Sequence, residues 1–121
     1  SIEFAAERFG SRLVVVLGHS GCGAISATIE TLQQPDVVQS RGIRSIVDRI
    51  RPSVETLVET GMKGDELIHY SVRANIRASV NHLKHGSELL EQLILKQGLM
   101  VVGAEYSLET GEVDFFDGLL N

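Results

Sequence analysis

The sequence predicts an α/β fold in which a parallel sheet is flanked by helices and followed by an antiparallel return strand. Residues 13–17 and 99–104 are two short apolar runs, which are typical of parallel strands buried on both faces. Between them, apolar residues recur every three or four positions, the spacing of helices that cover a sheet. Two parallel strands are too few for a complete sheet of this class. We therefore expect the sheet to be incomplete.

Length and composition indicate one ordinary globular domain spanning residues 1–121. Of the 121 residues, 43% are hydrophobic and 22% are charged. The 11 basic and 16 acidic residues give a formal net charge of -5, and no basic cluster is present, which argues against nucleic acid as a partner. No apolar segment approaches the roughly 20 residues that a membrane span needs, and no signal peptide opens the chain. We therefore expect a cytoplasmic protein with no membrane partner.

The first predicted strand lies between two predicted helices. Residues 1–9 carry apolar side chains at helical spacing, with Ser1 in the N-cap position and Gly10 just past the end. After a glycine-rich turn, helical spacing resumes at Ile25 and ends at Pro35. The polar residues 36–41 then predict a loop.

A longer helical pattern covers residues 43–58, but it contains Pro52. Because proline has no amide hydrogen and collides with the preceding turn, we expect a kink there or two shorter helices. Asp65 is the expected N-cap of the next helix, and Ser87 is the expected N-cap of the one that follows. Both helices would cover the sheet.

The last part of the chain predicts a hairpin. The second apolar run leads to a turn at Thr110 and Gly111, and the pattern of residues 112–116 favours an antiparallel return strand.

The turn after the first strand carries the most reactive side chains. His19 and Cys22, the only cysteine, stand three positions apart, and an imidazole and a thiolate together suit zinc. The glycines around them allow backbone conformations that other residues resist. Two ligands do not complete a zinc site, however. The other three histidines offer no paired spacing that would supply a third ligand: His69, His82 and His85.

Two other interpretations of this turn stay open. Cys22 lies at the start of a helix, where N–H groups favour a thiolate, so it could act as a nucleophile with His19 as its base. The amides of Gly21 and Gly23 could then form an oxyanion hole. Alternatively, Cys22 is a small apolar packing residue. The serine-hydrolase elbow G-x-S-x-G does not match, because Cys22 replaces its last glycine.

Charged and aromatic residues elsewhere have simpler interpretations. We interpret the arginines of the predicted helices as solvated, the remaining histidines as helix-surface residues and the tyrosines as half-buried packing residues. These arginines and tyrosines are Arg44, Arg49, Arg51, Arg73, Arg77, Tyr70 and Tyr106.

Four segments together point to a known family. Residues 1–5 have the sequence SIEFA, and residues 18–23 have the sequence GHSGCG. Further along the chain, Asn75-Ile76 forms an N-I step. Residues 102–113 contain a predicted strand, a T-G turn and the start of a predicted return strand. In this order and at these separations they resemble the β-class carbonic anhydrases. That family carries a helix of the type S-[IL]-E-[FY]-A before a buried strand that runs into G-H-x-x-C-G. The resemblance covers nearly the whole chain.

The resemblance implies a zinc enzyme that hydrates carbon dioxide reversibly to bicarbonate. The family holds its zinc with a cysteine, a histidine and a second cysteine, and the last two correspond to His19 and Cys22. Gly23 corresponds to a close-packed turn residue, which we assign to substrate binding. Because the family assembles as dimers and higher oligomers, we expect a homodimer or a higher homo-oligomer.

The sequence departs from the family in one respect. The first cysteine ligand belongs to a C-x-D-x-R motif, whose aspartate and arginine serve catalysis, and this motif is absent. No catalytic residue is therefore assigned, and we expect the domain to lack roughly its N-terminal third, including the strand beside residues 13–17. We expect weak or no activity from this chain alone. The alternative is a catalytically silent carbonic anhydrase-like module that acts through association or anion binding.

Overall fold

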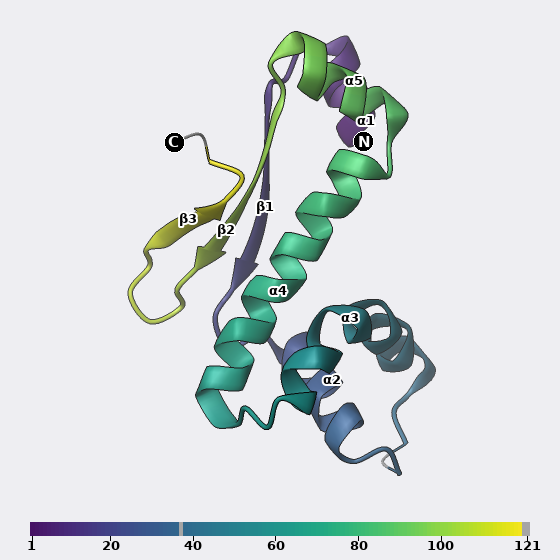
Figure 1. Cartoon of the computed structure of the whole chain (residues 1–121), viewed down its shortest axis with the longest axis vertical. Coiled ribbons are helices and arrows are strands. Elements are labelled where there is room, and N and C mark those ends of the chain that lie inside the picture. Colours follow the sequence, from purple (N-terminus) through teal and green to yellow (C-terminus); the bar gives the residue numbers. More distant parts are fainter. Residues whose placement is uncertain (37, 120–121) are drawn as a thin grey trace.

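The computed structural model describes residues 1–36 and 38–119 of the chain (Figure 1). Its elements, in chain order, are α1 (Ile2–Arg8), β1 (Leu13–His19), α2 (Gly23–Gln33), α3 (Arg41–Glu59), α4 (Gly64–His85), α5 (Glu88–Gln97), β2 (Met100–Tyr106) and β3 (Val113–Asp117). The predicted α/β class and the predicted order of helices and strands are confirmed.

The described residues form a three-stranded sheet with the order β1-β2-β3. β1 and β2 are parallel, with Leu13 beside Met100 at one end and His19 beside Tyr106 at the other. β2 and β3 are antiparallel, as the sequence predicts for the return strand. Within the described part of the chain, the second edge of β1 has no partner strand, so the expected incomplete sheet is also observed.

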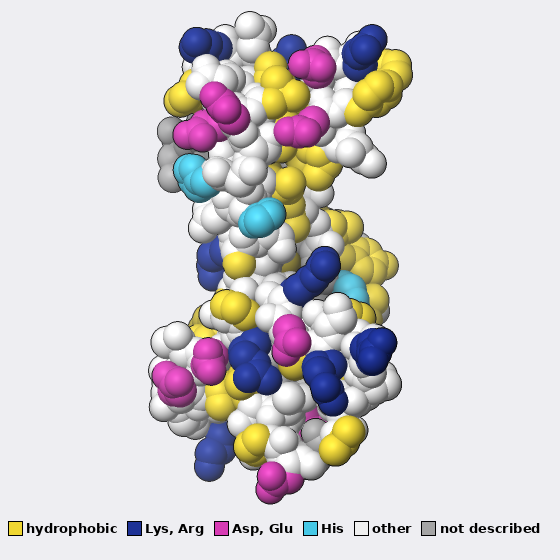
Figure 2. Space-filling view, turned by 90° about the vertical axis from the view of Figure 1, so that its right-hand side faces the viewer, with side chains coloured by type: hydrophobic (Ala, Val, Ile, Leu, Met, Phe, Trp, Pro, Cys, Tyr) yellow, Lys and Arg dark blue, Asp and Glu magenta, His cyan; other side chains and the backbone are white. Residues whose placement is uncertain are grey.

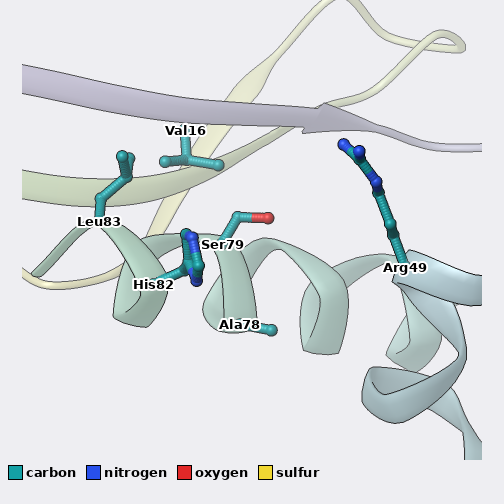
Figure 3. A pocket seen from close by; sticks show the side chains of 6 residues that line it. All are labelled: Val16, Arg49, Ala78, Ser79, His82 and Leu83. Carbon is teal, nitrogen blue, oxygen red and sulfur yellow. The ribbon is translucent and has the colours of Figure 1, made fainter. Parts of the chain in front are cut away.

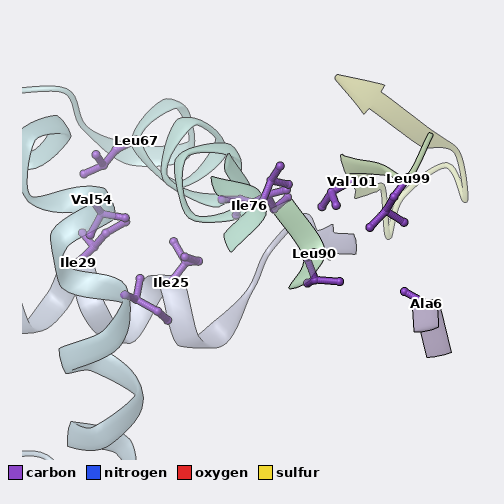
Figure 4. Packing of buried hydrophobic residues seen from close by; sticks show 12 residues of the cluster. Ala6, Ile25, Ile29, Val54, Leu67, Ile76, Leu90, Leu99 and Val101 are labelled. Carbon is purple, nitrogen blue, oxygen red and sulfur yellow. The ribbon is translucent and has the colours of Figure 1, made fainter. Parts of the chain in front are cut away.

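The helices lie on one face of this sheet. α4 runs along the sheet and contacts both β1 and β2, while α1 and α5 lie at one end of the molecule and α2 and α3 at the other (Figure 1). The buried hydrophobic cluster follows α4 over the same distance. It extends from Val54 and Leu67 near α2 and α3 to Leu90 and Leu99 near α5 (Figure 4).

Two glycines allow α4 to approach the sheet closely. A Cβ atom at Gly18 of β1 would lie 2.5 Å from Cδ1 of Ile76, and one at Gly103 of β2 would lie 2.9 Å from Cγ2 of the same isoleucine. Real side chains do not tolerate such separations without displacement. Ile76 therefore fills the space that these two glycines leave.

Two details of the predicted helices differ in the structure. Of the two alternatives expected at Pro52, two shorter helices are wrong, because α3 is a single helix that contains the proline. Val47, Ile50 and Val54 are buried on both sides of the proline, and their burial favours one continuous helix over a break. Asp65 is not an N-cap, because the N-cap of α4 is Lys63. Asp65 lies in the first turn instead, where a carboxylate still favours the positive end of the helix dipole.

Other helix ends agree with the predictions. The hydroxyl of Ser87 caps α5 by accepting a hydrogen bond from the amide of Leu90, and α5 ends at Gly98 in the left-handed conformation. Residues 36 and 38–40 form no regular element, as expected of the loop, whereas Arg41 already belongs to α3. Val37, which falls in the same prediction, lies outside the described residues.

The face of β1 that points away from α4 is apolar and exposed. Leu13, Val15 and Leu17 alternate along it with exposed fractions of 58%, 39% and 56%. Figure 2 shows the molecule narrowing at the level of α4 between its two ends, with hydrophobic side chains visible at this level. Among the described residues, no helix is long and apolar enough to cross a membrane.

Candidate metal centre

The candidate centre is the turn between β1 and α2. His19 is the last residue of β1, and Cys22 is the N-cap of α2, with an extended backbone. Gly21 between them has a φ of +62°, a conformation that favours glycine. The predicted order of strand, glycine turn and helix is therefore confirmed. It brings both side chains to the carboxyl end of the parallel strands, where α/β proteins bind their ligands.

The ring of His19 is oriented by the backbone. Its Nδ1 atom lies 2.9 Å from the carbonyl oxygen of Ser20. Because a carbonyl oxygen only accepts hydrogen bonds, Nδ1 carries the proton in the neutral ring, and Nε2 keeps its lone pair. Histidine ligands of metals usually have this arrangement, with one nitrogen bound to a carbonyl group and the other to the metal.

Cys22 presents a free thiol in a partly buried position. Its side chain packs against the hydrophobic cluster, and the first amides of α2 lie next to it. Cysteine binds metals through its sulfur atom. In the described residues, no hydrogen bond joins this thiol to the imidazole of His19.

The two donors fit zinc in kind but not in number. Zinc prefers four ligands of nitrogen, sulfur or oxygen, and His19 and Cys22 supply one nitrogen and one sulfur. In residues 1–36 and 38–119, no group of three or more His, Cys, Asp or Glu side chains could hold a metal ion. The turn therefore offers at most two of the four ligands that zinc prefers, and we call this candidate pair the His19–Cys22 half-site.

Gly23 is not close-packed in this chain. A Cβ atom at Gly23, the first residue of α2, would meet no atom of the described residues within 4 Å. The described residues therefore do not supply the tight packing that the resemblance implies for this glycine. Its backbone faces open space beside the half-site.

Arg73 of α4 is the main site residue that the sequence did not reveal, and its interpretation as solvated is wrong. Its Nε atom donates a hydrogen bond of 2.8 Å to Glu105, and its Nη2 atom donates one of 2.6 Å to Asp114. Glu105 is buried, with 7% of its surface exposed, so Arg73 compensates a carboxylate that is removed from water. The partners stand 32 and 41 positions away in the sequence, and no local pattern signals such contacts.

The environment of Arg73 changes its pKa. Burial alone would lower the pKa of this guanidinium, but the hydrogen bonds to Asp114 and Glu105 and their negative charges raise it above its usual value. A group whose pKa is higher in the folded chain than in the unfolded chain stabilises the fold below its unfolded-chain pKa. This contribution is lost only as the pH rises through its folded-chain pKa. The Arg73 guanidinium therefore stays charged throughout the physiological range.

The remaining arginines differ from one another. Arg44 and Arg49 are exposed, as expected. Arg51 is partly buried, and its Nε atom has no hydrogen-bond partner in the part of the chain that the structure describes. The guanidinium carbon of Arg77 lies 5.0 Å from the centre of the Phe116 ring, which is a cation–π distance.

The histidines and tyrosines agree with their simpler interpretations. Tyr70 and Tyr106 keep 48% and 36% of their surfaces exposed. The three other histidines are exposed on α4, although Nδ1 of His69 lies 3.9 Å from the Glu105 carboxylate.

An open notch of about 620 Å³ lies between β1, α3 and α4. Val16 of β1 and the α4 residues Ser79 and His82 face it, and Arg49 reaches from α3 toward β1 (Figure 3). Its walls are mostly apolar carbon. This apolar notch therefore borders β1, the strand whose second edge is unpaired in the described residues.

Comparison with known proteins assigns the chain to a family. The sequence model of the carbonic anhydrase family matches residues 1–113. The chain belongs to the β-carbonic anhydrase family. A carbonic anhydrase of Mycolicibacterium smegmatis is 32% identical over 115 residues, which are 94% of this chain and 53% of that protein. Carbonic anhydrase 2 of Mycobacterium tuberculosis is 29% identical over an alignment of 122 positions, which covers 100% of this chain and 56% of that protein.

Solved structures of β-carbonic anhydrases share the fold. The enzyme CafA of Aspergillus fumigatus superposes with a TM-score of 0.81 at 21% identity, covering 99% of this chain and 55% of that one. A tetrameric β-carbonic anhydrase of Sordaria macrospora gives a TM-score of 0.78 at 18% identity, covering 95% and 57% of the two chains. The chain thus spans about half the length of the curated relatives and solved structures that it matches.

Proposed function

We propose that this β-carbonic anhydrase chain is part of a zinc enzyme that hydrates carbon dioxide reversibly to bicarbonate, with His19 and Cys22 as zinc ligands. The observation that carries the proposal is the turn itself. It combines an imidazole whose Nδ1 atom is hydrogen-bonded to a carbonyl group, which leaves Nε2 as the donor for a metal, with a thiol at a helix N-terminus, at the carboxyl end of a parallel strand. When bound, zinc would supply Lewis-acid activation of water.

The residues of the turn have separate tasks in this proposal. Nε2 of His19 and Sγ of Cys22 bind the metal. The Ser20 carbonyl keeps the proton of His19 on Nδ1, so that Nε2 stays available. Gly23 is proposed to contact substrate through its backbone, because open space lies beside it.

The half-site needs further ligands, and we propose that they come from outside the described residues. The chain has no C-x-D-x-R motif, and β1 has an unpaired edge in the described residues. A parallel strand along this edge would bring its own carboxyl end next to His19. It would also cover the apolar notch between β1 and α4. The chain alone is therefore expected to bind zinc weakly and to show little or no hydration activity.

The experiment measures zinc and activity in the same sample of the 121-residue chain. We expect zinc binding that is lost in His19→Gln and in Cys22→Ser, and retained in the matched control His82→Gln on α4. Carbon dioxide hydration should be weak or absent. Zinc binding that survives both substitutions would refute the assigned ligands, and normal turnover with full zinc occupancy would refute the incomplete site.

A catalytically silent module is the second candidate. It is favoured by the exposed apolar face of β1. Such a module would act through association or anion binding. The coding sequence upstream of Ser1 separates the two candidates: a C-x-D-x-R motif there supports the enzyme, and a natural start without it supports the module.

We further propose that the complete protein forms a homodimer or a higher homo-oligomer. The exposed hydrophobic residues of β1 support association, because large exposed apolar patches mark interaction surfaces. A tetrameric β-carbonic anhydrase of Sordaria macrospora shares the fold. A cytoplasmic location stays a prediction.

A further inference from the structure

Ser20 lies between the two proposed ligands and makes three hydrogen bonds. Its carbonyl oxygen accepts from Nδ1 of His19 at 2.9 Å. Its amide donates to the carbonyl oxygen of Tyr106 at 2.9 Å, and its Oγ atom accepts from the amide of Leu108 at 2.9 Å. One residue thus connects the ring of His19 to the end of β2 and to the loop that follows it.

The loop that holds Ser20, residues 107–112 between β2 and β3, is fixed by its own hydrogen bonds. The amide of Ser107 donates to the carbonyl of Glu112, and the amide of Gly111 donates back to the carbonyl of Ser107. The hydroxyls of Ser107 and Thr110 accept from the amides of Thr110 and Glu112. This loop is therefore an ordered support for Ser20 and not a loose connection.

Arg73 fixes both strands of the hairpin to α4. Glu105 of β2 and Asp114 of β3 are directly opposite each other in the sheet, and the guanidinium binds both carboxylates. Its carbon atom also lies 4.4 Å from the centre of the Phe116 ring. Hydrogen bonds to two carboxylates, in a side chain that is 21% exposed, hold the arginine more firmly than a single surface ion pair would.

We propose that Ser20 is the positioning residue of the His19–Cys22 half-site, and that the hairpin held by Arg73 keeps Ser20 in place. The hydroxyl of Ser20 binds the hairpin loop, the loop fixes the turn, and the turn keeps the Ser20 carbonyl on Nδ1 of His19. The imidazole then presents Nε2 in one tautomer and one orientation. This inference rests on the proposed function, because zinc is the ligand for which His19 is positioned.

The test uses the 121-residue chain and two readouts. Zinc affinity is measured by calorimetric titration, and the tautomer of His19 and the hydrogen exchange of the Leu108 amide are measured by nuclear magnetic resonance without metal. The variants are Ser20→Ala, which removes the acceptor, and Ser20→Thr, which retains it. Ser26→Ala on the exposed side of α2 is the matched control.

Ser20→Ala should weaken zinc binding by about tenfold or more, the usual effect of losing a residue that orients a metal ligand. It should also speed exchange of the Leu108 amide and mix the two tautomers of His19. Ser20→Thr and Ser26→Ala should resemble the unaltered chain. Unchanged zinc affinity and an unchanged His19 tautomer in Ser20→Ala would overturn the inference, whether or not exchange at Leu108 becomes faster.

A second pair of variants tests the support from α4. Arg73→Gln should weaken zinc binding in the same direction as Ser20→Ala, whereas Arg77→Gln should not. If Arg73→Gln and Arg77→Gln change zinc binding equally, the proposed role of Arg73 is contradicted. This comparison tests the support from α4 even if Ser20→Ala does not fold. If the unaltered chain binds no zinc, the prediction that His19 and Cys22 bind zinc within this chain fails. The tautomer of His19 in Ser20→Ala then still decides the inference, because mixed tautomers support it and a single tautomer overturns it.

Discussion

Gly18 lies immediately before His19, at a point where β1 approaches α4 closely. A Cβ atom there would stand 2.5 Å from Cδ1 and 2.7 Å from Cγ1 of Ile76, whose side chain is buried. The missing side chain at Gly18 thus lets the strand that carries His19 lie directly on α4. Gly18, which allows this close packing, therefore also determines where the proposed ligand His19 lies.

Gly18→Ala is expected to lower the free energy of unfolding by about 1–3 kcal/mol, because the added methyl group must displace Ile76 in a filled core. Urea unfolding followed by circular dichroism measures the change. Gly42→Ala is the matched control, since a Cβ atom at this α3 position meets nothing within 4 Å. The control should be neutral or stabilising, because alanine favours a helix more than glycine does. A Gly18→Ala protein as stable as the original would refute the close approach.

Among individual residues, the sequence indicated those that belong to a short local motif. His19 and Cys22 stand three positions apart on a glycine turn, and the structure brings both to the strand end. Arg73 looked like any other helical arginine, because its partners Glu105 and Asp114 are distant in sequence. Only the tertiary fold places these charges together.

α3 shows how packing decides the course of an element. The helix runs from Arg41 to Glu59 through Pro52, although proline removes one hydrogen-bond donor from its interior. Pro52 itself is exposed, while Val47, Ile50 and Val54 stay on the buried side. The apolar stripe thus keeps the helix in one piece across an unfavourable residue.

Pro52→Ala should raise the free energy of unfolding by roughly 1–3 kcal/mol. The amide of alanine can donate to the carbonyl four residues earlier, and this gain exceeds the entropy that proline removes from the unfolded chain. The exposed substitution Glu55→Ala on the same helix should change stability by about 0.5 kcal/mol or less. A decrease for Pro52→Ala in thermal or urea unfolding would contradict the claim that Pro52 destabilises a continuous α3.

Periodicity predicted the elements more successfully than their ends. Apolar runs and helical stripes extend over many residues, so one unusual position does not hide them. Asp65 was a wrong N-cap because Lys63 and Gly64 begin the helix earlier, and Lys63 has no local feature of an N-cap. Ser87 was correct because its hydroxyl accepts from the Leu90 amide.

The whole molecule is an α/β layer pair in which one sheet edge and the outer face of β1 are uncovered in the described residues. β1 has the apolar character of an interior strand, yet it lies at the edge of the sheet that these residues form. Solvent-exposed edges with apolar side chains promote association. The matched relatives are about twice as long as the chain.

The purified chain is therefore expected to associate as its concentration rises, and Leu17→Lys should reduce that association by placing a charge on the exposed face of β1. Sedimentation velocity at several concentrations measures this effect. Leu95→Lys is the control, because Leu95 is 71% exposed on α5, away from the sheet edge. Equal association of the two variants, or a monomer at every concentration, would show that this surface does not drive association.

X-ray absorption at the zinc edge of the zinc-loaded chain tests the central claim most directly. If His19 and Cys22 form half of a zinc site, the spectrum should show one sulfur neighbour at about 2.3 Å and one imidazole nitrogen at about 2.0–2.1 Å, with oxygen from solvent completing the shell. The Cys22→Ser chain should lose the sulfur signal. A spectrum with no sulfur neighbour would contradict Cys22 as a ligand. Two sulfur neighbours, with one zinc for every two chains, would contradict a half-site within each chain.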